Sequence, residues 1–202
     1  MIMIDLQHLS ARDTYKLLIG TIAPRPIAFV TTESAEGAIN AAPFSFFNIV
    51  SSAPPLLSVS VQRRHGEQKD TARNAIAKKG FVIHITDEQN VEGVNETAAT
   101  LAPDESELDR THFTVIESEK LKIPAVQEAK VRFECTLERH VPLGEKEAIM
   151  TDLLIGRIVC MHVAEEVYDD GKIMYEKLQP VGRLAGNDYA KLGEIFSLIR
   201  PK

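Results

Sequence analysis

The stretch from Ala41 to Asn48 combines small, aromatic and polar side chains in a way that suits a flat ligand. The alanines would let a planar molecule approach the backbone, and Pro43 keeps the segment extended. Ser45 and Asn48 supply hydrogen-bonding groups beside the aromatic surface of the phenylalanines. This combination predicts a site for a heterocycle with polar edges. In the alternative, which stays open, the phenylalanines belong to the core and Pro43 marks the end of a strand.

A candidate anion site lies at Lys69-Asp70-Thr71, where a helix is expected to begin. Asp70 is expected to cap a helix over 71–79 that ends at the next glycine. The first turn of a helix presents unpaired N–H groups and the positive end of its dipole, which favour phosphate. Lys69, Thr71 and the preceding Arg63 would add cations and a hydroxyl. The alternative is an ordinary capped surface helix with solvated basic neighbours.

A third candidate is the segment 180–189, in which two glycines flank Arg183 and Tyr189 follows. Glycines give a loop the freedom to fold over a ligand. We therefore expect Arg183 and Tyr189 to lie in a loop that reaches over a ligand. The alternative is a plain connection near the C-terminus, with Arg183 in a salt bridge.

Residues for acid–base or nucleophilic catalysis do not form a familiar motif. The chain has no GxSxG, HExxH or CxxC sequence, so we expect neither a nucleophilic serine nor a metal site. His84 and His162 fall in expected strands, where they would line the core or barrel, and His65 is the histidine expected nearest a ligand. Candidate sites for a heterocycle and a phosphate, without catalytic side chains, suit a cofactor that supplies its own reactivity.

Composition places the chain among ordinary globular proteins. With 202 residues, 44% of them hydrophobic and 26% charged, we expect a single domain over 1–202. A net charge of -6 argues against nucleic acid as the main partner. No apolar run approaches the roughly 20 residues of a membrane helix, and the N-terminus does not resemble a signal peptide. Cys135 and Cys160 are far apart in strand-like runs, so we expect reduced thiols and a soluble, cytoplasmic protein.

Short strands joined by turns account for most of the pattern, with one helix expected after Ser10, a second over 88–101 and a short one near Leu192. Strands are expected over 27–32, 39–43, 57–61, 81–86, 131–138 and 153–163. In 131–138, apolar residues alternate with polar ones such as Glu134, whereas 153–163 is apolar enough to be buried on both faces. The fold class is mainly β: an antiparallel barrel with helical insertions.

An ordered set of motifs covering about residues 10–190 resembles the flavin reductase-like family of FMN-binding split β-barrels. The matching segments are Arg25–Thr32, Gly37, Asn40–Asn48, Pro54-Pro55, Lys69–Thr71 with Asn74, Gly80–Ile83, Glu134-Cys135, Ile155–Arg157 and Pro180–Leu184. The resemblance implies a six-stranded antiparallel Greek-key barrel with short flanking helices. It also implies a homodimer that binds one FMN at each subunit interface.

The resemblance assigns flavin contacts to particular positions of this chain. Ala42 to Asn48 would contact the ring system, and Thr31 and Thr32 would lie near the ribityl chain or ring edge. Arg63, Lys69 and Thr71 would hold the phosphate, and Arg183 and Tyr189 would close the site from the same or the partner subunit. The full set of expected cofactor-binding residues is Arg25, Pro26, Thr31, Thr32, Ala42, Pro43, Phe44, Ser45, Phe46, Phe47, Asn48, Arg63, Lys69, Asp70, Thr71, Arg183 and Tyr189.

The activity that the resemblance implies is hydride transfer from NADH or NADPH to FMN, and on to free flavin, a monooxygenase or another acceptor. The alternative within the family is an FMN-binding electron carrier or sensor that has a protein redox partner and no nicotinamide activity. A third possibility is a split barrel that has lost flavin.

Overall fold

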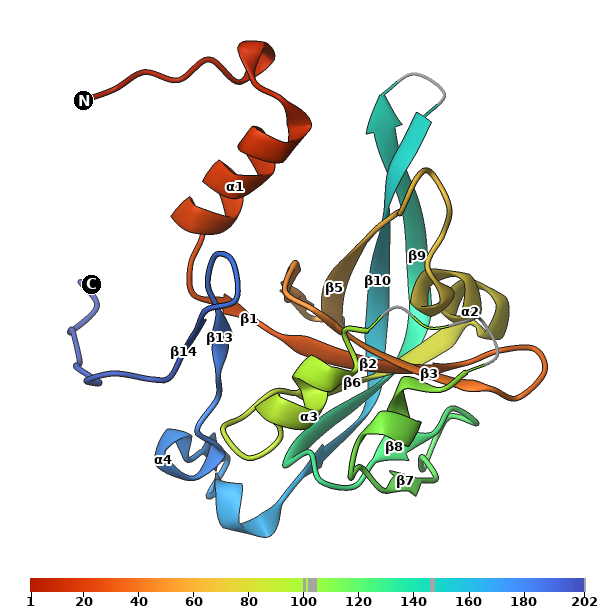
Figure 1. Ribbon diagram of the computed structural model, residues 1–202. Helices are drawn as coiled ribbons and strands as arrows, with labels where there is room; N and C mark the ends of the chain where they lie inside the picture. The colour runs from red at the N-terminus through yellow and green to blue at the C-terminus, as the bar shows by residue number, and fades with distance from the viewer. Residues whose placement is uncertain (100, 102–104, 146–147, 202) are drawn as a thin grey trace.

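Seven antiparallel strands form the main sheet of the computed structural model, which describes residues 1–99, 101, 105–145 and 148–201 (Figure 1). Two residues, Ser45 and Phe46, separate β3 from β4 in the chain, although these strands lie at opposite ends of the sheet. The sheet therefore curls until its two edges meet, as in a split barrel. The order across it is β3 (Ile39–Phe44), β2 (Ala28–Glu33), β6 (Gly80–Ile85), β9 (Val131–Glu145), β10 (Ala148–Val163), β5 (Pro55–Gln62) and β4 (Phe47–Ser52).

The mainly β, antiparallel fold class is as expected, but the expectation of six strands is wrong for the main sheet. The strand not foreseen as a separate element is β4, which falls in the aromatic segment and the break after it. β4 pairs with β5, and its residues Asn48, Ile49 and Val50 are exposed. Because neither face of β4 is fully buried, its sequence lacks the two-residue alternation that predicts a strand.

Aliphatic and aromatic side chains fill the barrel interior. Leu57, Val59 and Val61 of β5 are buried, as their alternation predicts, and they belong to one cluster with Phe81 of β6. A Cβ atom at Gly156 of β10 would lie 2.5 Å from Cζ of Phe81. The absence of a side chain at Gly156 is therefore what admits the Phe81 ring.

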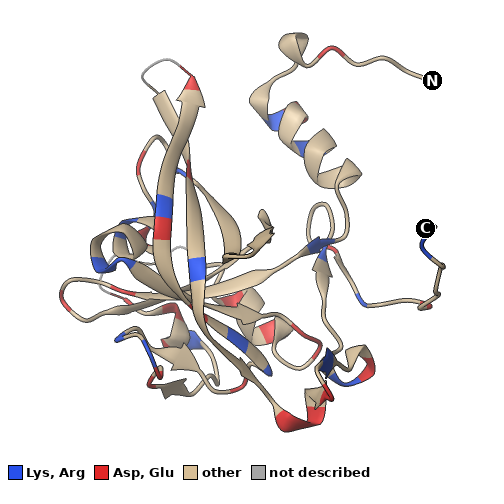
Figure 2. Cartoon of the chain, turned by 180° about the vertical axis from the view of Figure 1, so that it is seen from behind, with Lys and Arg blue, Asp and Glu red and all other residues tan. Residues whose placement is uncertain are grey.

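The hairpin of β9 and β10 departs from its sequence pattern. Burial of 153–163 on both faces is wrong, because Val159 and Met161 of β10 are exposed. Conversely Glu134 of β9, expected on the solvated face, is only 1% exposed. Figure 2 shows opposite charges side by side on this hairpin, where Nε of Arg157 donates to a carboxylate oxygen of Glu138 at 2.8 Å.

Among the residues that the structure describes, three helices have six or more residues. Helix α1 (Ala11–Thr21) begins as expected, since Oγ of Ser10 accepts a hydrogen bond from the N–H of Asp13 at 3.1 Å. Lys69 occupies the N-cap position of helix α2 (Asp70–Lys78) and makes no side-chain capping hydrogen bond, so the prediction that Asp70 is the cap is wrong by one position.

Helix α2 ends where Lys79 adopts the left-handed conformation with φ of 58°, and Gly80 already belongs to β6. Helix α3 (Val91–Glu96) is much shorter than the helix expected over 88–101, a span that includes residue 100 outside the described residues. The expected helix near Leu192 is wrong, because 191–201 has no regular structure.

Short elements complete the fold. A three-stranded sheet joins β1 (Arg25–Pro26), β13 (Gly182–Arg183) and β14 (Tyr189–Ala190), so the C-terminal part of the chain returns to the start of the barrel. The remaining elements are β7 (Val115–Ile116), β8 (Ala125–Val126), β11 (Tyr168–Asp169), β12 (Lys172–Ile173), α4 (Tyr175–Leu178) and the 3₁₀ helices η1 (Leu6–His8), η2 (Glu107–Arg110) and η3 (Glu165–Val167).

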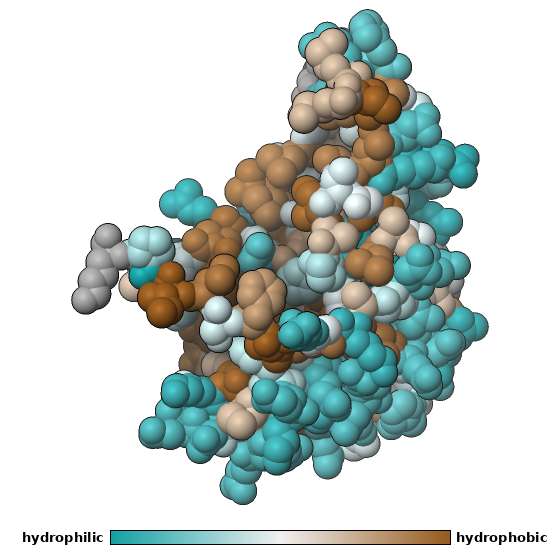
Figure 3. Space-filling view, turned by 90° about the vertical axis from the view of Figure 1, so that its left-hand side faces the viewer, coloured by the Kyte–Doolittle hydropathy of each residue, from teal (hydrophilic) through white to brown (hydrophobic). Residues whose placement is uncertain are grey.

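Helix α1 and the C-terminal segment extend from the same side of the barrel (Figure 1). Hydrophobic side chains gather on the face that carries them (Figure 3). Exposed members include Leu18 and Ile22 of α1 and Phe196 and Ile199 of the C-terminal segment. Within the described part of the chain, no helix has both the length and the apolar character needed to cross a membrane.

Candidate functional site

Two adjoining cavities lie where α1 meets the corner at which the edges of the sheet come together. The lysine cavity, of about 130 Å³, is lined by Tyr15, Pro43, Phe44, Ser45, Phe46, Ser60, Gln62 and Lys69. The arginine cavity, of about 220 Å³, is lined by Tyr15, Ile27, Pro43, Ser45, Val94, Asn95, Ala98, Arg183 and Tyr189. Because Tyr15, Pro43 and Ser45 line both, the two cavities form one candidate site.

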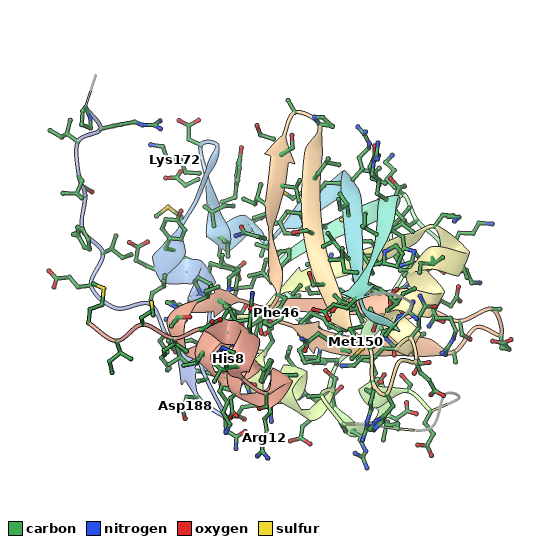
Figure 4. The ribbon with its side chains drawn as sticks, turned by 90° about the horizontal axis from the view of Figure 1, so that it is seen from above. His8, Arg12, Phe46, Met150, Lys172 and Asp188 are labelled. Carbon is green, nitrogen blue, oxygen red and sulfur yellow. The ribbon has the colours of Figure 1, made fainter. Side chains whose placement is uncertain are left out.

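The corner between β3 and β4 positions the shared wall of this site. Ser45 and Phe46 bridge the two strands, and the carbonyl oxygen of Phe46 accepts a hydrogen bond from the N–H of Ser60 at 2.8 Å. This bond ties the bridge to β5. Phe46, labelled in Figure 4, lines the lysine cavity together with Tyr15 of α1.

Aromatic surface and polar groups are combined in the lysine cavity. Nζ of Lys69 lies 5.8 Å from the centre of the Phe44 ring, within range of a cation–π interaction. Burial, and then the charge of Arg64, lower the pKa of Lys69 below its usual value. Among the described residues, nothing hydrogen-bonds to the side chains of Ser60, Gln62 and Lys69. These groups can therefore bind a ligand at little cost to the fold.

The arginine cavity is more apolar and carries one stacked cation. Cζ of Arg183 lies 4.4 Å from the centre of the Tyr189 ring. The hydroxyl of Tyr189 donates to Oδ1 of Asn95 at 2.9 Å. Arg183 and Tyr189 thus lie beside Pro43 and Ser45 of their own chain, as a loop that closes a site would.

Arg25 and Pro26 do not line these two cavities. The guanidinium of Arg25 is buried and donates to the carbonyl oxygens of Ile19 and Ile22 at 2.7 Å and of Leu184 at 2.9 Å. Burial lowers its pKa. Its Nε reaches Oγ of Ser45 at 3.4 Å. Arg25 therefore joins α1, the corner and the C-terminal loop, and orients the site indirectly.

Three threonines with expected ligand roles are buried in the barrel wall. Oγ1 of Thr31 donates to the carbonyl oxygen of Pro124 at 2.6 Å. Nδ2 of Asn40 donates to Oγ1 of Thr71 at 2.8 Å and to Oγ1 of Thr32 at 3.4 Å. Their hydroxyls are held by these bonds and none lines either cavity.

Arg63, Lys69 and Thr71, which were expected to bind the phosphate together, do not line one common cavity. Nε and an Nη atom of Arg63 donate to the two carboxylate oxygens of buried Asp152, each at 2.9 Å. Burial alone would raise the pKa of Asp152, but hydrogen bonds from Arg63, Gln68 and His140 lower it to about 2. Asp70 instead forms a salt bridge with Arg73 of its own helix. Of the expected phosphate contacts, Lys69 alone lines the site.

The residues of the aromatic segment, 42–48, lie in three different environments: the cavity wall, the core and the exposed surface. Pro43, Phe44, Ser45 and Phe46 line the site. Ala42 and Phe47 pack against the core, and Asn48 is exposed, with its Oδ1 accepting from the N–H of Ile49 at 2.8 Å. The open alternative therefore holds for part of the segment, since Phe44 both packs in the core and lines the lysine cavity.

Sequence reasoning missed seven lining residues. Ser60 and Gln62 lie on the polar side of β5, so their alternation with buried valines could have indicated them. Tyr15 carries no such signal, because its role depends on where α1 packs. The others are Ile27, Val94, Asn95 and Ala98.

The histidines contribute nothing to the cavity walls. His84 is buried as expected, between the carbonyl oxygen of Phe29 at 3.0 Å and the N–H of Val126 at 2.9 Å, and burial lowers its pKa to about 3. His65 occupies a turn residue with φ of 53° and lines neither cavity.

Comparisons with known proteins agree with this architecture. The family model for the flavin reductase like domain matches residues 20–179. The uncharacterized Bacillus subtilis protein YwrF is 59% identical over 204 residues, with 100% of both chains covered. The structure of nitrilotriacetate monooxygenase component B from Bacillus cereus is 55% identical, with a TM-score of 0.96 and 98% of each chain covered.

A more distant structure is the 2-nitrobenzoate 2-nitroreductase NbaA of Pseudomonas fluorescens. It is 30% identical, with a TM-score of 0.89, and covers 99% of this chain and 96% of its own. A match of the family model to most of the chain, together with these relatives, fixes the assignment. The chain belongs to the flavin reductase-like domain family.

Proposed function

We propose that this protein is an NAD(P)H-dependent flavin reductase that binds FMN in the candidate site. The observation that carries the proposal is the lysine cavity, where aromatic rings, unengaged polar groups and the ammonium group of Lys69 line one space. The two cavities, of about 130 and 220 Å³, together reach the roughly 300 Å³ at the lower end of ligand sites. Family membership supports flavin as the ligand.

The donor set fits FMN. Phe44, Phe46 and Pro43 offer flat apolar surface for a ring system, and Ser45, Ser60 and Gln62 offer groups for its polar edge. Lys69, at the start of α2, is the cation for the phosphate, and the helix dipole adds to its field. In this assignment Arg63 supports the site from behind by fixing Asp152 and β10.

The chemistry that bound FMN would supply is the acceptance of hydride from a nicotinamide cofactor and the transfer of electrons to an acceptor. Neither a histidine nor a carboxylate lines the two cavities among the described residues. We infer that the chain contributes by holding two ring systems together and excluding water. The arginine cavity, with Arg183 stacked on Tyr189, is where we place the nicotinamide cofactor, because Arg183 can pair with its phosphates.

Anaerobic addition of NADH or NADPH to the FMN-loaded protein tests this function. We expect bleaching of the flavin absorbance by at least one of the two. The Arg183→Gln variant should raise the KM for that cofactor by about tenfold while retaining FMN. Arg157→Gln, an exposed arginine outside both cavities, is the matched control and should leave KM unchanged. Tightly bound FMN that neither cofactor bleaches would overturn the reductase and favour the electron carrier.

The acceptor we propose is the oxygenase component of a two-component monooxygenase. The support is the name of the Bacillus cereus structure, which is component B of nitrilotriacetate monooxygenase. Turnover with free FMN in excess should then release reduced flavin, seen as oxygen consumption that scales with added FMN. Oxygen consumption independent of free FMN would contradict a released product.

We also propose that the protein is a homodimer. The support is the exposed hydrophobic face that carries α1 and the C-terminal segment (Figure 3), since a contiguous apolar surface of this kind is typical of an interface. Sedimentation velocity at micromolar concentration should show a dimer, and the double change Phe196→Asp with Ile199→Asp should shift it toward monomer. A wild-type monomer at that concentration would contradict the proposal.

A further inference from the structure

Three side chains with metal-binding atoms meet on the hairpin of β9 and β10, away from the residues that line the candidate flavin site. Nε2 of His162 lies 2.7 Å from Oε1 of Glu134 and 3.5 Å from Sγ of Cys160. The three ligand atoms lie within 4.8 Å of one another. Glu134 is buried, whereas Cys160 and His162 are partly exposed. The buried Glu134 is therefore the inner member of the group, and the side formed by Cys160 and His162 is open to solvent.

A β-bulge brings these residues together. Ile158 pairs with Cys135 and Cys160 pairs with Glu134, so the intervening Val159 has no partner in the ladder. Cys160 thereby lies directly opposite Glu134, on the same face of the sheet. His162 follows two residues later and returns to that face. Without the bulge, Cys160 would oppose Phe133 and would be carried away from the carboxylate.

The Glu134 carboxylate is held in place before any ion binds. It accepts backbone hydrogen bonds from Glu119 at 2.8 Å, Lys120 at 2.7 Å and Leu121 at 2.9 Å. Burial alone would raise the pKa of Glu134, but hydrogen bonds from His162 and these N–H groups lower it below its usual value. Such outer contacts orient a metal ligand and keep it ionised.

The geometry does not suit a cysteine–histidine–carboxylate catalytic triad. In a triad the histidine bridges the other two groups, with one ring nitrogen toward each. Here Nε2 makes both contacts. Three donor atoms that converge on one point instead match the arrangement around an ion. Tetrahedral zinc, with Zn–S about 2.3 Å and Zn–N about 2.0 Å, places sulfur and nitrogen about 3.5 Å apart.

We propose that Glu134, Cys160 and His162 bind one Zn²⁺ ion. Binding would release the thiol proton of Cys160 to solvent and would place the ring proton of the neutral His162 on Nδ1, so that Nε2 is free to bind; the two anionic ligands, Glu134 and Cys160, would then balance the charge of the ion. The nitrogen–oxygen contact must open from 2.7 Å by about 0.5 Å, which the partly exposed His162 can accommodate. Mixed sulfur, nitrogen and oxygen ligands are within the range that zinc accepts. The fourth ligand would be water on the exposed side.

Calorimetric titration of the reduced full-length protein with Zn²⁺ tests this site. We expect one equivalent per chain and a melting temperature that rises with Zn²⁺. Cys160→Ser and His162→Gln should each weaken binding by at least about tenfold. His8→Gln, an exposed histidine distant in sequence, is the matched control and should bind as wild type does. Glu134 is left unchanged, because it also holds the 119–121 segment.

Alkylation supplies a readout independent of heat. Iodoacetamide should modify Cys160, and Zn²⁺ should suppress that modification as read by peptide mass spectrometry. Cys135 is an internal reference that should remain unmodified, because burial raises its pKa to about 12. Wild-type protein that takes up less than one Zn²⁺ per chain overturns the proposal. So does equal binding by wild type, Cys160→Ser and His162→Gln.

Discussion

Polar side chains in the barrel wall already have hydrogen-bond partners within the protein, whereas several polar side chains of the lysine cavity have none among the described residues. In the wall, Asp152 is bound by Arg63, Gln68 and His140, and Thr71 is bound by Asn40. In the cavity, among the described residues, nothing hydrogen-bonds to the side chains of Ser60, Gln62 and Lys69.

The difference separates two roles within one set of family motifs. A buried polar group that is fully bonded stabilises the wall, and removing its partner leaves an uncompensated charge or donor. A group that has no partner in the fold can change without that cost, and its effect falls on the ligand. Substitutions in the wall should therefore act on stability, and substitutions in the cavity on FMN affinity.

The largest effect is expected at Asp152. Asp152→Asn weakens a buried ion pair and should lower the free energy of unfolding by about 3 kcal/mol, measured by urea denaturation. Because folding depresses the pKa of Asp152 to about 2, its ionisation stabilises the protein above the ordinary value of 3.8. That contribution is lost as pH falls from about 4 toward 2. If Asp152→Asn were as stable as wild type and lost stability over the same range of acid pH, the bonded polar groups of the wall would not stabilise the fold as we expect.

A smaller loss of stability is expected from a change at Thr71. This change tests whether Thr71 stabilises the barrel wall or contacts the phosphate directly. Thr71→Val removes the acceptor for Nδ2 of Asn40 and should destabilise the protein by about 1–3 kcal/mol. FMN affinity should stay within about twofold of wild type, measured by fluorescence titration. A large loss of affinity with unchanged stability would place Thr71 in the binding site after all.

Lys69 should show the opposite pattern. Lys69→Gln should weaken FMN binding by about tenfold, equivalent to about 1.4 kcal/mol, and leave the urea midpoint close to that of wild type. Lys78→Gln is the matched control, because Lys78 lies at the other end of α2 and pairs with Glu33. Equal FMN affinities of Lys69→Gln and Lys78→Gln would show that Lys69 does not bind the phosphate.

The smallest effect is expected at the exposed pair on the β9–β10 hairpin. Glu138→Gln removes the partner of Arg157 and should shift the melting temperature by less than about 2 °C, because solvent and salt screen an exposed pair. Differential scanning calorimetry at low and high salt measures it. A shift comparable to that of Asp152→Asn would show that burial is not what distinguishes the wall.

Much of the barrel could be predicted from the sequence, because burial of one strand face leaves a two-residue period. β5 shows this in Leu57, Val59 and Val61. β4 and the β10 surface could not be predicted, because an exposed edge and an exposed apolar face do not produce that period. Glu134 was misplaced for a related reason: a charged residue in an alternating strand indicates solvent unless backbone donors from a distant segment reach it.

Site residues could be predicted where neighbouring residues in the sequence line the cavity together. They could not be predicted where contacts between distant parts of the chain decide which side chains reach the cavity. The corner residues and Lys69 line the site because their types suit a ligand and the chain places them there. Arg63 and Thr71 have equally suitable types, but Asp152 and Asn40, both distant in sequence, engage them. Tyr15 joins the site only through the packing of α1.

FMN titration of wild type and Ser60→Phe tests the location of the site most directly. Ser60 lines the lysine cavity, so a phenyl ring there should fill it and abolish measurable FMN binding while the barrel stays folded by circular dichroism. Ser58→Phe, two residues earlier on β5 and outside the cavity lining, should bind one FMN per chain as wild type does. Undiminished FMN binding by folded Ser60→Phe would contradict the account.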